Sequence, residues 1–399
     1  MRKIFAPRQS FVVSNQIRFH KRETGRGQKN PSPFFLCPNF HENRKKLSKL
    51  KIKNNMNKIF SFKNIFLAAV ALAASVPAVS AVAAEKIRAG YLPTTGHAKF
   101  FVAYEEGFFK EEGLNVELVE FSNSADGIAA LRARKLDIAA FGTSAPLIHI
   151  SRGADLRIIG GVMGEDAAIF TSAKNAGTLK TVADLKGKKI ATVRLSSGDA
   201  ILRGALADAG LDWKKDVRLF ELKNPPAVQE AVRTGQVDAG ITWGPYDIRA
   251  EQAGLFVAIR SRDLYPGHPC CRLAVNTASL RENPEIWVKF LRAFLKAEKF
   301  ALTHKDETVA HIQKYFEIDA ETIRKGFYEG FLDQTTDPNL RGLETFWKTI
   351  RNSGFAQKDI DIAKVVNVEL YKQALESLRK ENPEEPFWRE LQKIFQQRN

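Results

Sequence analysis

Strand and helix patterns alternate along residues 87–259, and this alternation constrains the fold more than any other feature. Residues 136–141, for example, form a short apolar run typical of a buried strand, and helical patterns flank it. The same order of patterns restarts after Gly177. Strands that alternate with helices build mainly parallel sheets. The sequence therefore predicts an α/β fold, followed from residue 284 by amphipathic helices and after residue 380 by a charged, loosely held tail.

An internal repeat favours two lobes built on the same plan. Residues 130–140 and 231–241 match at an offset of 101 residues, and each places an Asp-led strand of small residues after the end of a helix. Chance similarity between two α/β units is the other explanation. Ligands of open α/β sheets bind beyond the carboxyl ends of the strands. Two such lobes that face each other would therefore bring their loops to one cleft.

Four loops that follow predicted strands are rich in small and hydroxyl residues. Three of them lead directly into predicted helices, whose first N–H groups favour an anion. Ordinary helix capping by Ser, Thr and Asp explains any one of these loops equally well, but four in the same topological position favour ligand binding. The candidate ligand-binding residues in these loops are Thr94, Thr95, Gly96, His97, Gly142, Thr143, Ser144, Ser196, Ser197, Gly198, Trp243 and Tyr246.

Catalytic and metal-binding motifs are missing from the sequence. There is no Gly-x-Ser-x-Gly, His-Glu-x-x-His or phosphate-binding Gly-rich pattern. His97 and His149 lack neighbours in the sequence that would form a triad or a metal site. We therefore expect a binding protein without a cofactor, a metal or enzymatic activity.

Residues 56–84 have the pattern of a secretory signal peptide. Met56 and two lysines precede a short apolar run, and small residues precede Glu85. The run is too short to span a bilayer, which takes about 20 residues. No cysteine follows the small residues, so a lipid anchor is not supported. We expect the protein to be exported to the periplasm.

The positive charge of the chain lies at its N-terminal end. Residues 1–55 hold 14 Lys and Arg against Glu23 and Glu42, whereas the whole chain has a formal net charge of +16. Residues 85–399 are thus nearly neutral, which argues against a nucleic-acid partner. We expect residues 1–55 to be upstream sequence read in frame before a true start at Met56; a basic, disordered tail is the alternative.

Three segments carry a resemblance to a known family. Residues 90–116, Asp184–Ile190 and Gly235–Pro245 resemble periplasmic substrate-binding proteins of sulfonate, taurine and nitrate transporters, the SsuA/THI5-like (NMT1) family. The resemblance implies a hinged, two-lobed type II periplasmic binding protein, expected to be a monomer, that delivers a small solute to an ABC permease. It also implies a lobe 1 of residues 85–178 and 275–399, a lobe 2 of residues 179–274, and a ligand cleft with Thr143, Ser144, Ser196, Ser197 and Trp243.

The resemblance leaves the solute open. An anion such as a sulfonate, nitrate or taurine would suit helix N-termini together with Arg194 or Arg272. The alternatives are a thiamine-pyrimidine precursor binding protein and a pyrimidine synthase of the same group. Gly96-His97 matches the pyrimidine-binding pattern only in part, and His268-Pro-Cys-Cys departs from the cysteine-rich segment of the synthases.

Cys270 and Cys271 stand where the chain is expected to return from lobe 2 to lobe 1. Free thiols persist poorly in an oxidising compartment, but neighbouring Cα atoms lie only about 3.80 Å apart and can close only a strained ring. Three interpretations remain: a vicinal disulfide, a soft-metal or thiol-reactive site with His268, or two buried small apolar residues. The disulfide is our prediction, with Arg272 beside it facing an anionic group of the ligand.

Overall fold

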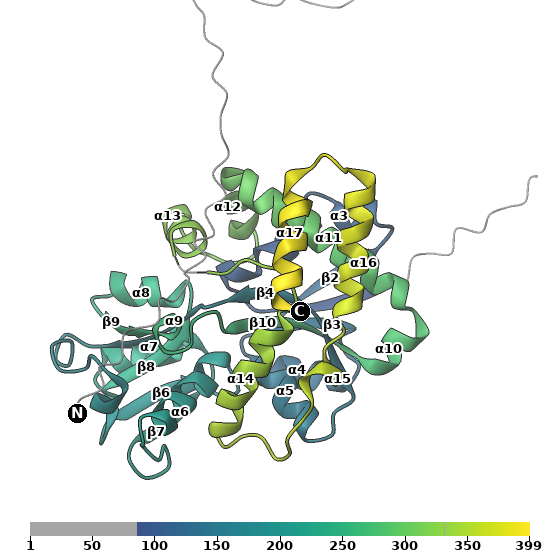
Figure 1. Ribbon diagram of the computed structural model, residues 1–399. Helices are drawn as coiled ribbons and strands as arrows, with labels where there is room; N and C mark the ends of the chain where they lie inside the picture. Colours follow the sequence, from purple (N-terminus) through teal and green to yellow (C-terminus); the bar gives the residue numbers. More distant parts are fainter. Residues whose placement is uncertain (1–85, 331) are drawn as a thin grey trace, which may run out of the picture. The chain divides into compact units, whose positions relative to one another are not determined.

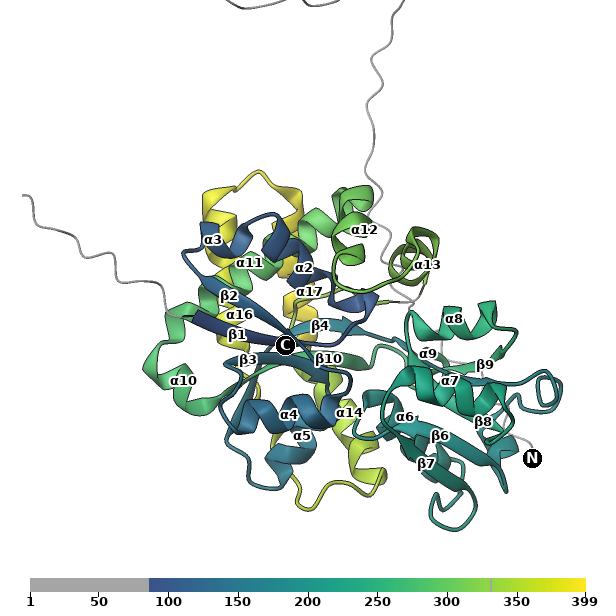
Figure 2. The ribbon, with the colours of Figure 1, turned by 180° about the vertical axis from the view of Figure 1, so that it is seen from behind.

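The computed structural model describes residues 86–330 and 332–399, which belong to one compact unit, Ser80–Asn399. The predicted N-terminal extension 1–55 and signal peptide 56–84 lie outside the described residues. In the described residues, helices surround two five-stranded sheets (Figures 1 and 2). No helix in this part of the chain is both long enough and apolar enough to cross a bilayer.

The first sheet has the strand order β2-β1-β3-β10-β4. β1 runs parallel to β2 and β3, whereas β10 runs antiparallel to both of its neighbours. Alternate residues of β3 face different cores: Ile138 and Ala140 belong to one, Ala139 and Phe141 to the other. The sheet is therefore covered on both faces. Its strands are β1 (Lys86–Tyr91), β2 (Asn115–Glu120), β3 (Ile138–Gly142), β4 (Leu156–Gly164) and β10 (Pro269–Asn276).

The second sheet repeats this plan in the order β7-β6-β8-β5-β9. β6 runs parallel to β7 and β8, and β5 runs antiparallel between β8 and β9. β3 and β8 are thus equivalent strands, and they are the strands of the internal repeat. The predicted α/β fold with two lobes of the same plan is confirmed. The strands are β5 (Ala167–Thr171), β6 (Lys189–Val193), β7 (Arg218–Leu222), β8 (Ala239–Trp243) and β9 (Phe256–Arg260).

The chain crosses between the sheets at other points than the predicted lobe boundaries, 178/179 and 274/275. β5 belongs to the second sheet, so the first crossing lies between Gly164 and Ala167. β10 belongs to the first sheet, so the return precedes Pro269. The prediction was wrong because each sheet takes its antiparallel strand from the chain just after a crossing, and long-range pairing, not the local turn residues, decides which sheet that strand joins.

Helices from the two halves of the chain share the faces of the first sheet. α2, α11, α16 and α17 pack on one face, and α4, α5 and α14 on the other. They are α2 (Ala98–Glu105), α4 (Ser124–Arg132), α5 (Ser144–Ser151), α11 (Pro284–Thr303), α14 (Leu340–Asn352), α16 (Val368–Glu381) and α17 (Pro386–Arg398), with the shorter α3 (Phe108–Glu111), α10 (Thr277–Glu282), α12 (Lys305–Gln313), α13 (Ala320–Arg324), the π-helical turn η3 (Lys325–Glu329) and α15 (Ile362–Val365).

The second sheet is flanked by its own helices, and one of them meets the first lobe. α6 packs against α14, so the second lobe contacts the C-terminal half of the chain. The helices are α6 (Ser197–Asp208), α7 (Pro225–Arg233), α8 (Tyr246–Gln252) and α9 (Ser261–Leu264), and the 3₁₀ turns are η1 (Thr95–His97) in the first lobe and η2 (Val182–Leu185) in the second.

The C-terminal residues are not the loose tail that the sequence predicted. α17 buries Phe387, Trp388, Leu391 and Phe395, and the side chain of Asn399 donates hydrogen bonds to Asp337. Apolar residues one turn apart give this helix a buried stripe despite its charged surroundings. The end of the chain is therefore part of the core of the first lobe.

Candidate functional site between the two sheets

The four predicted loops meet between the two sheets. Each follows a parallel strand: Pro93–His97 follows β1, Gly142–Ser144 follows β3, Leu195–Asp199 extends from β6, and Trp243–Tyr246 extends from β8. Equivalent strands of two facing sheets point their carboxyl ends at the same place, which is why these loops converge. We call these four segments the interlobe loops.

Direct hydrogen bonds join the interlobe loops of the two lobes. Thr94 Oγ1 donates to the carbonyl oxygen of Gly244 at 2.6 Å. Ser144 Oγ donates to the carbonyl oxygen of Leu195 at 2.9 Å. Ser197 Oγ donates to the carbonyl oxygen of Cys270, on β10 of the first sheet, at 2.6 Å. The lobes are therefore in contact at the predicted site.

Two glycines allow the close approach of the chain at this site. A Cβ on Gly142 would lie 2.8 Å from the backbone nitrogen of Ser197 in the other lobe. A Cβ on Gly96 would lie 1.9 Å from Sδ of Met163. Neither position has room for a side chain. A Cβ on Gly198 would lie 3.3 Å from Cγ1 of Ile241 in its own lobe, a tight contact but a smaller conflict than those at Gly142 and Gly96.

Several polar atoms of the interlobe loops are buried without a hydrogen-bond partner. They include Thr95 Oγ1, Thr143 Oγ1 and the indole Nε1 of Trp243. Thr95 and Thr143 are fully buried, and Trp243 is 6% exposed. Buried polar atoms are nearly always paired. Two hydroxyls and one N–H donor are therefore available here to a polar partner.

The helix-capping interpretation is correct for one of the four loops. Ser196 Oγ accepts a hydrogen bond from the backbone N–H of Asp199, and Asp199 Oδ2 accepts one from the backbone N–H of Leu195. Asp199 also pairs with Arg203 at 2.8 Å. Burial raises the pKa of Asp199 to about 6. The first turn of α6 thus already holds a carboxylate where the sequence predicted room for an anion.

His97 and Tyr246 fix the loops on which they lie. His97 Nδ1 accepts the backbone N–H of Leu92 at 3.1 Å. Burial lowers the pKa of His97 to about 3, so the ring is neutral and offers no positive charge to a ligand. Tyr246 is buried, contacts Trp243 edge to face, and has its hydroxyl 3.4 Å from the carbonyl oxygen of Pro93.

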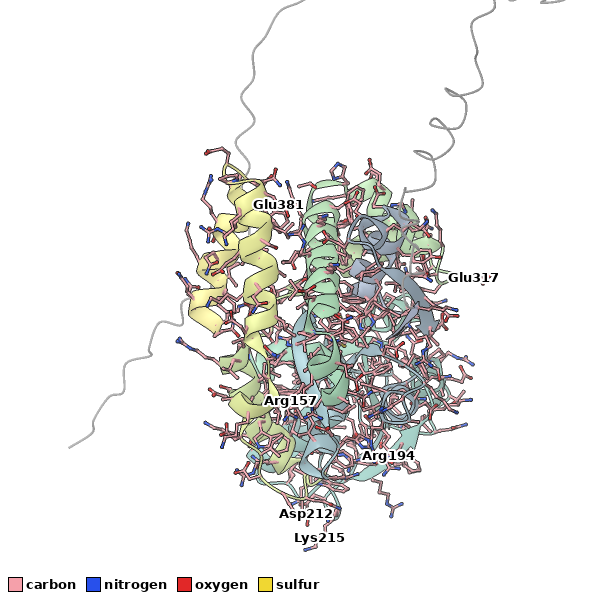
Figure 3. All side chains as sticks on the ribbon, turned by 90° about the vertical axis from the view of Figure 1, so that its right-hand side faces the viewer. Arg157, Arg194, Asp212, Lys215, Glu317 and Glu381 are labelled. Atoms are coloured by element: carbon pink, nitrogen blue, oxygen red, sulfur yellow. The ribbon has the colours of Figure 1, made fainter. Side chains whose placement is uncertain are left out.

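The two arginines expected to bind an anion have other partners. The side chain of Arg194 is 58% exposed, and its Nε lies 3.4 Å from Glu221 of the same lobe (Figure 3). Arg272 is buried and donates to the carbonyl oxygens of Met163, Cys271 and Pro338, all in the first lobe. Nη2 of Arg272 is buried without a hydrogen-bond partner, so the role of this residue in facing an anionic group of the ligand stays a prediction.

Cys270 and Cys271 are free thiols, so the predicted vicinal disulfide is wrong. Both residues lie on β10, where Cys271 pairs with Gly142 of β3 and Met163 of β4, and the register with β4 shifts on both sides of Cys271. Hydrogen bonds from the Cys271 thiol and the Ser197 hydroxyl lower the pKa of Cys270, whereas burial raises the pKa of Cys271. Nor do His, Cys, Asp and Glu side chains of the described residues form a group of three or more that could hold a metal.

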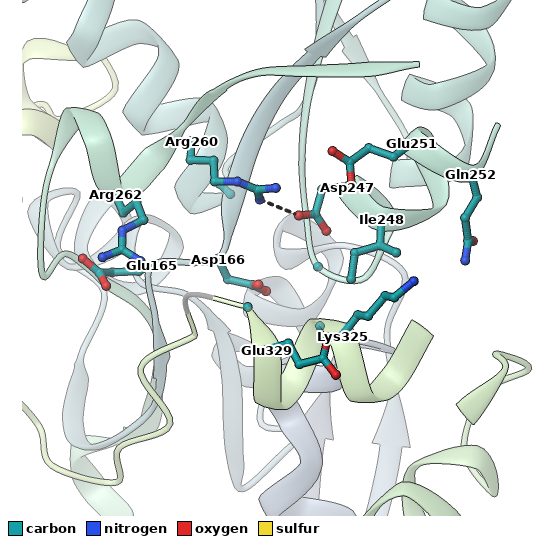
Figure 4. Close-up of a pocket in the computed structure, with 14 residues that line it drawn as sticks. Glu165, Asp166, Asp247, Ile248, Glu251, Gln252, Arg260, Arg262, Lys325 and Glu329 are labelled. Carbon is teal, nitrogen blue, oxygen red and sulfur yellow. Dashed lines mark hydrogen bonds and ion pairs between the residues drawn. The ribbon is translucent and has the colours of Figure 1, made fainter. Parts of the chain in front are cut away.

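A cavity adjoins the interlobe loops and was not predicted from the sequence. It has a volume of about 480 Å³, and Figure 4 shows its charged side chains. Four parts of the chain contribute to its walls: the first crossing, the segment from β8 to α8, the segment from β9 into α9, and η3 with Gly330. Its lining residues are Glu165, Asp166, Ala167, Gly244, Asp247, Ile248, Glu251, Gln252, Arg260, Arg262, Lys325, Gly326, Glu329 and Gly330. We call it the acidic cavity.

One signal could have pointed to this cavity. Asp247 directly follows the predicted loop residue Tyr246, and Glu165-Asp166 lie at the crossing between the lobes. The contribution of η3 could not be predicted, because it comes from a part of the chain that contains only helical patterns. Because the lobe boundary was expected at residue 178, the crossing between Gly164 and Ala167 was not considered as part of a site.

Comparison with known proteins agrees with the fold. The structure of the aliphatic sulphonate binding protein SsuA from Escherichia coli superposes with a TM-score of 0.59 at 23% identity, covering 72% of this chain and 99% of that one. The nitrate-binding protein NrtA from Synechocystis PCC 6803 superposes with a TM-score of 0.65 at 17% identity, covering 74% and 89%. These neighbours share the periplasmic binding protein fold.

Sequence relatives carry names of the same kind. A protein of Bacillus subtilis named as an aliphatic sulfonates-binding protein is 30% identical over 291 residues, which are 69% of this chain and 84% of that protein. A protein of Brucella abortus named as a binding protein is 29% identical over 263 residues, 65% and 77% of the two chains. The profile of the NMT1-like family matches residues 80–315. The chain therefore belongs to the NMT1-like family.

Proposed function

We propose that the protein is the solute-binding component of an ABC import system. In this proposal the signal peptide at residues 56–84 directs it to the periplasm, where a monomer captures a small solute between its lobes and delivers it to a membrane permease without changing it chemically. The relatives named as sulfonate-binding proteins support this role.

The observation that carries the proposal is the meeting of the interlobe loops. Loops from two separate sheets hydrogen-bond to each other, and Thr95, Thr143 and Trp243 still have buried polar atoms without partners. A solute between the lobes would satisfy those atoms and hold the lobes together. Because the side chain of Arg194 pairs with Glu221 of its own lobe, hydroxyl and N–H groups of the loops would bind an anionic group of the solute.

A thermal-shift screen tests the proposal. Alkanesulfonates, taurine, nitrate and pyrimidine precursors are added to the purified protein one at a time. A solute at a hundred times its Kd should stabilise the fold by about 2.7 kcal/mol. A Thr143→Val variant, which keeps the shape of the side chain but loses the hydroxyl, should show a smaller shift. Recovery of the stabilising solute in altered form would instead support an enzyme such as a pyrimidine synthase.

A further inference from the structure

The acidic cavity has the size and the position of a solute compartment. About 480 Å³ is within the range of sites for small molecules, which is roughly 300–1,000 Å³. Gly244 lines the cavity, and its carbonyl oxygen is the acceptor for Thr94. A solute in the cavity would therefore lie directly beside the interlobe loops.

Carboxylates outnumber basic side chains around the cavity. Five lining residues are acidic and three are basic. Two of these basic groups have acidic partners: Arg260 Nη1 lies 3.0 Å from Asp247 Oδ2, and Lys325 Nζ lies 2.7 Å from Glu321. The cavity therefore offers hydrogen-bond acceptors, and its carboxylates would repel an anionic solute.

Two of these carboxylates keep a buried oxygen without a partner. Oδ2 of Asp166 and Oδ1 of Asp247 are buried and accept no hydrogen bond. Figure 4 shows the two side chains on the same side of the cavity, with Lys325 opposite. Buried carboxylate oxygens require a donor or a cation.

A fully buried hydroxyl completes the arrangement. Thr95 is 0% exposed, and its Oγ1 has no partner. A Cβ added to Gly326, which lines the cavity, would lie 3.3 Å from this oxygen and 3.4 Å from Cδ1 of Ile248, another lining residue. Thr95 Oγ1 therefore lies at the wall that joins the cavity to the loop after β1.

We infer that the solute carries a cationic nitrogen group, an ammonium or an amidinium, which binds in the acidic cavity against Asp166 and Asp247. This inference rests on the proposed function and names the class of its solute. Thr95 Oγ1, which lies next to Gly326 at the cavity wall, is the nearest unpaired hydroxyl of the interlobe loops. Among the solutes that the resemblance implies, this favours one with an ammonium group, such as taurine, over nitrate or a simple alkanesulfonate.

The electrostatics of Asp166 agree with this geometry. Burial, with Cys270 and Asp247 close by, raises the pKa of Asp166 well above its ordinary value, against the opposing effects of the Gly244 backbone and Arg260. A cation bound at Asp166 would remove most of the cost of ionising this carboxyl group.

Matched solutes test the inference by isothermal titration calorimetry on the purified protein. Taurine is compared with isethionate, in which a hydroxyl replaces the ammonium, and 4-aminobutyrate is compared with butyrate. In at least one pair the amine should bind at least tenfold more tightly. Asp247→Asn and Asp166→Asn should each reduce that preference to less than threefold. Glu282→Gln, which removes an exposed carboxylate on α10 outside the cavity, should leave it unchanged.

The outcomes separate this inference from the proposed function. Tighter binding of isethionate or butyrate, or a preference for the amine that survives both Asp substitutions, overturns the inference and leaves the import function standing. If no solute of either pair binds, but a solute without a cationic nitrogen binds in the thermal-shift screen, the inference is also wrong. Binding of no solute at all overturns both. If Asp247→Asn fails to fold, Asp166→Asn and the matched solutes decide alone.

Discussion

Trp243 presents an indole N–H donor to the boundary between the lobes. The ring packs against Tyr246, and Nε1 is buried without a partner. Trp243→Phe removes the donor and shrinks the buried ring, so some loss of stability is expected as well. We expect the affinity per folded molecule to fall about five- to tenfold, the value of one hydrogen bond of about 1–1.5 kcal/mol.

The control for this prediction is Tyr246→Phe, which removes a hydroxyl engaged only at 3.4 Å with Pro93. It should change the affinity much less than Trp243→Phe. Equal affinities of Trp243→Phe and the wild type, measured by calorimetry, would show that the indole N–H does not contact the solute.

The two buried histidines of the boundary region predict how stability depends on pH. Burial lowers the pKa of His97 to about 3 and that of His268 to about 4, whereas an unfolded histidine titrates near 6.5. Between these values the unfolded chain binds more protons, so both histidines lower the free energy of unfolding as the pH falls from about 6.5 to 4. Asp199, whose pKa is raised to about 6, acts in the opposite direction.

A single substitution isolates the contribution of His97. In His97→Asn, the amide oxygen can still accept the N–H of Leu92, but the proton uptake is lost. Urea unfolding at several pH values gives the free energy of unfolding as a function of pH. Between pH 6.5 and 4 the slope of this plot should correspond to nearly one proton less for the variant than for the wild type. Identical slopes for the variant and the wild type would contradict the assigned pKa.

Residue types alone indicated where the polar loops lie but not how individual side chains point. Ser144, Ser197 and Thr94 follow strands, and the topology decides where strand ends meet, so their convergence was predictable. Arg272 was not predictable, because its three acceptors lie up to 109 residues away along the chain. The sequence shows which charge a strand residue carries, but it does not show which groups that side chain contacts.

At the scale of elements, one contact joins α6 of the second lobe to the end of α14. The guanidinium of Arg203 lies 4.1 Å from the ring of Trp213 and 4.5 Å from the ring of Phe355, which follows α14. Asp199 and Glu221 each accept a hydrogen bond from Arg203 at 2.8 Å. Arg203 is thus held between aromatic rings of the two lobes.

Substitution of Phe355 measures the value of this contact. Phe355→Leu keeps an apolar side chain but loses the cation–π interaction, and should reduce the free energy of unfolding by about 0.5–1 kcal/mol. Phe355→Ala also loses apolar contact and should cost about 2–3 kcal/mol. Urea unfolding measures both. A Leu variant as unstable as the Ala variant would assign the stabilisation to the aromatic face of Phe355.

The helices show which elements a sequence pattern identifies. α6 and α7 start after Ser196 and Asn224, whose side chains cap them, and were predictable from these residues. α17 was missed because charged residues precede it, although its buried residues are spaced by helical turns. The π-helical turn η3 cannot be told from an α-helix by its sequence pattern, and so Gly326 within it and Gly330 after it escaped prediction as parts of the acidic cavity.

At the scale of the whole molecule, each lobe takes one antiparallel strand from the chain just after a crossing. β5 and β10 lie next to the crossings in the chain and occupy the same antiparallel position in the two sheets. The internal repeat contains only the parallel part of this plan, β3 and β8 with their helices. The repeated plan was therefore predictable, whereas the lobe boundaries were not, because long-range pairing decides which sheet an isolated strand joins.

The contacts between the interlobe loops predict that the solute and the closed arrangement stabilise each other. Thr94 Oγ1 joins the loop after β1 to Gly244 of the other lobe at 2.6 Å. Thr94→Val removes this bond and leaves a buried carbonyl without its donor, at a cost of about 1–3 kcal/mol in the closed arrangement. In an open arrangement water can donate a hydrogen bond to this carbonyl, so the substitution destabilises only the closed arrangement. The affinity for the solute should therefore drop at least fivefold.

Small-angle scattering on the same protein separates this effect from a local one. The radius of gyration of the wild type should decrease when the solute is added, and Thr94→Val should need a higher solute concentration for the same decrease. Thr303→Val is the matched control, because its hydroxyl contacts only the carbonyl oxygens of Lys299 and Phe300 and the ring of the neighbouring His304, far from the interlobe loops in sequence. A radius that stays constant on saturation with solute would mean that the lobes do not close upon it, and the Thr94–Gly244 bond would then be a permanent part of the fold.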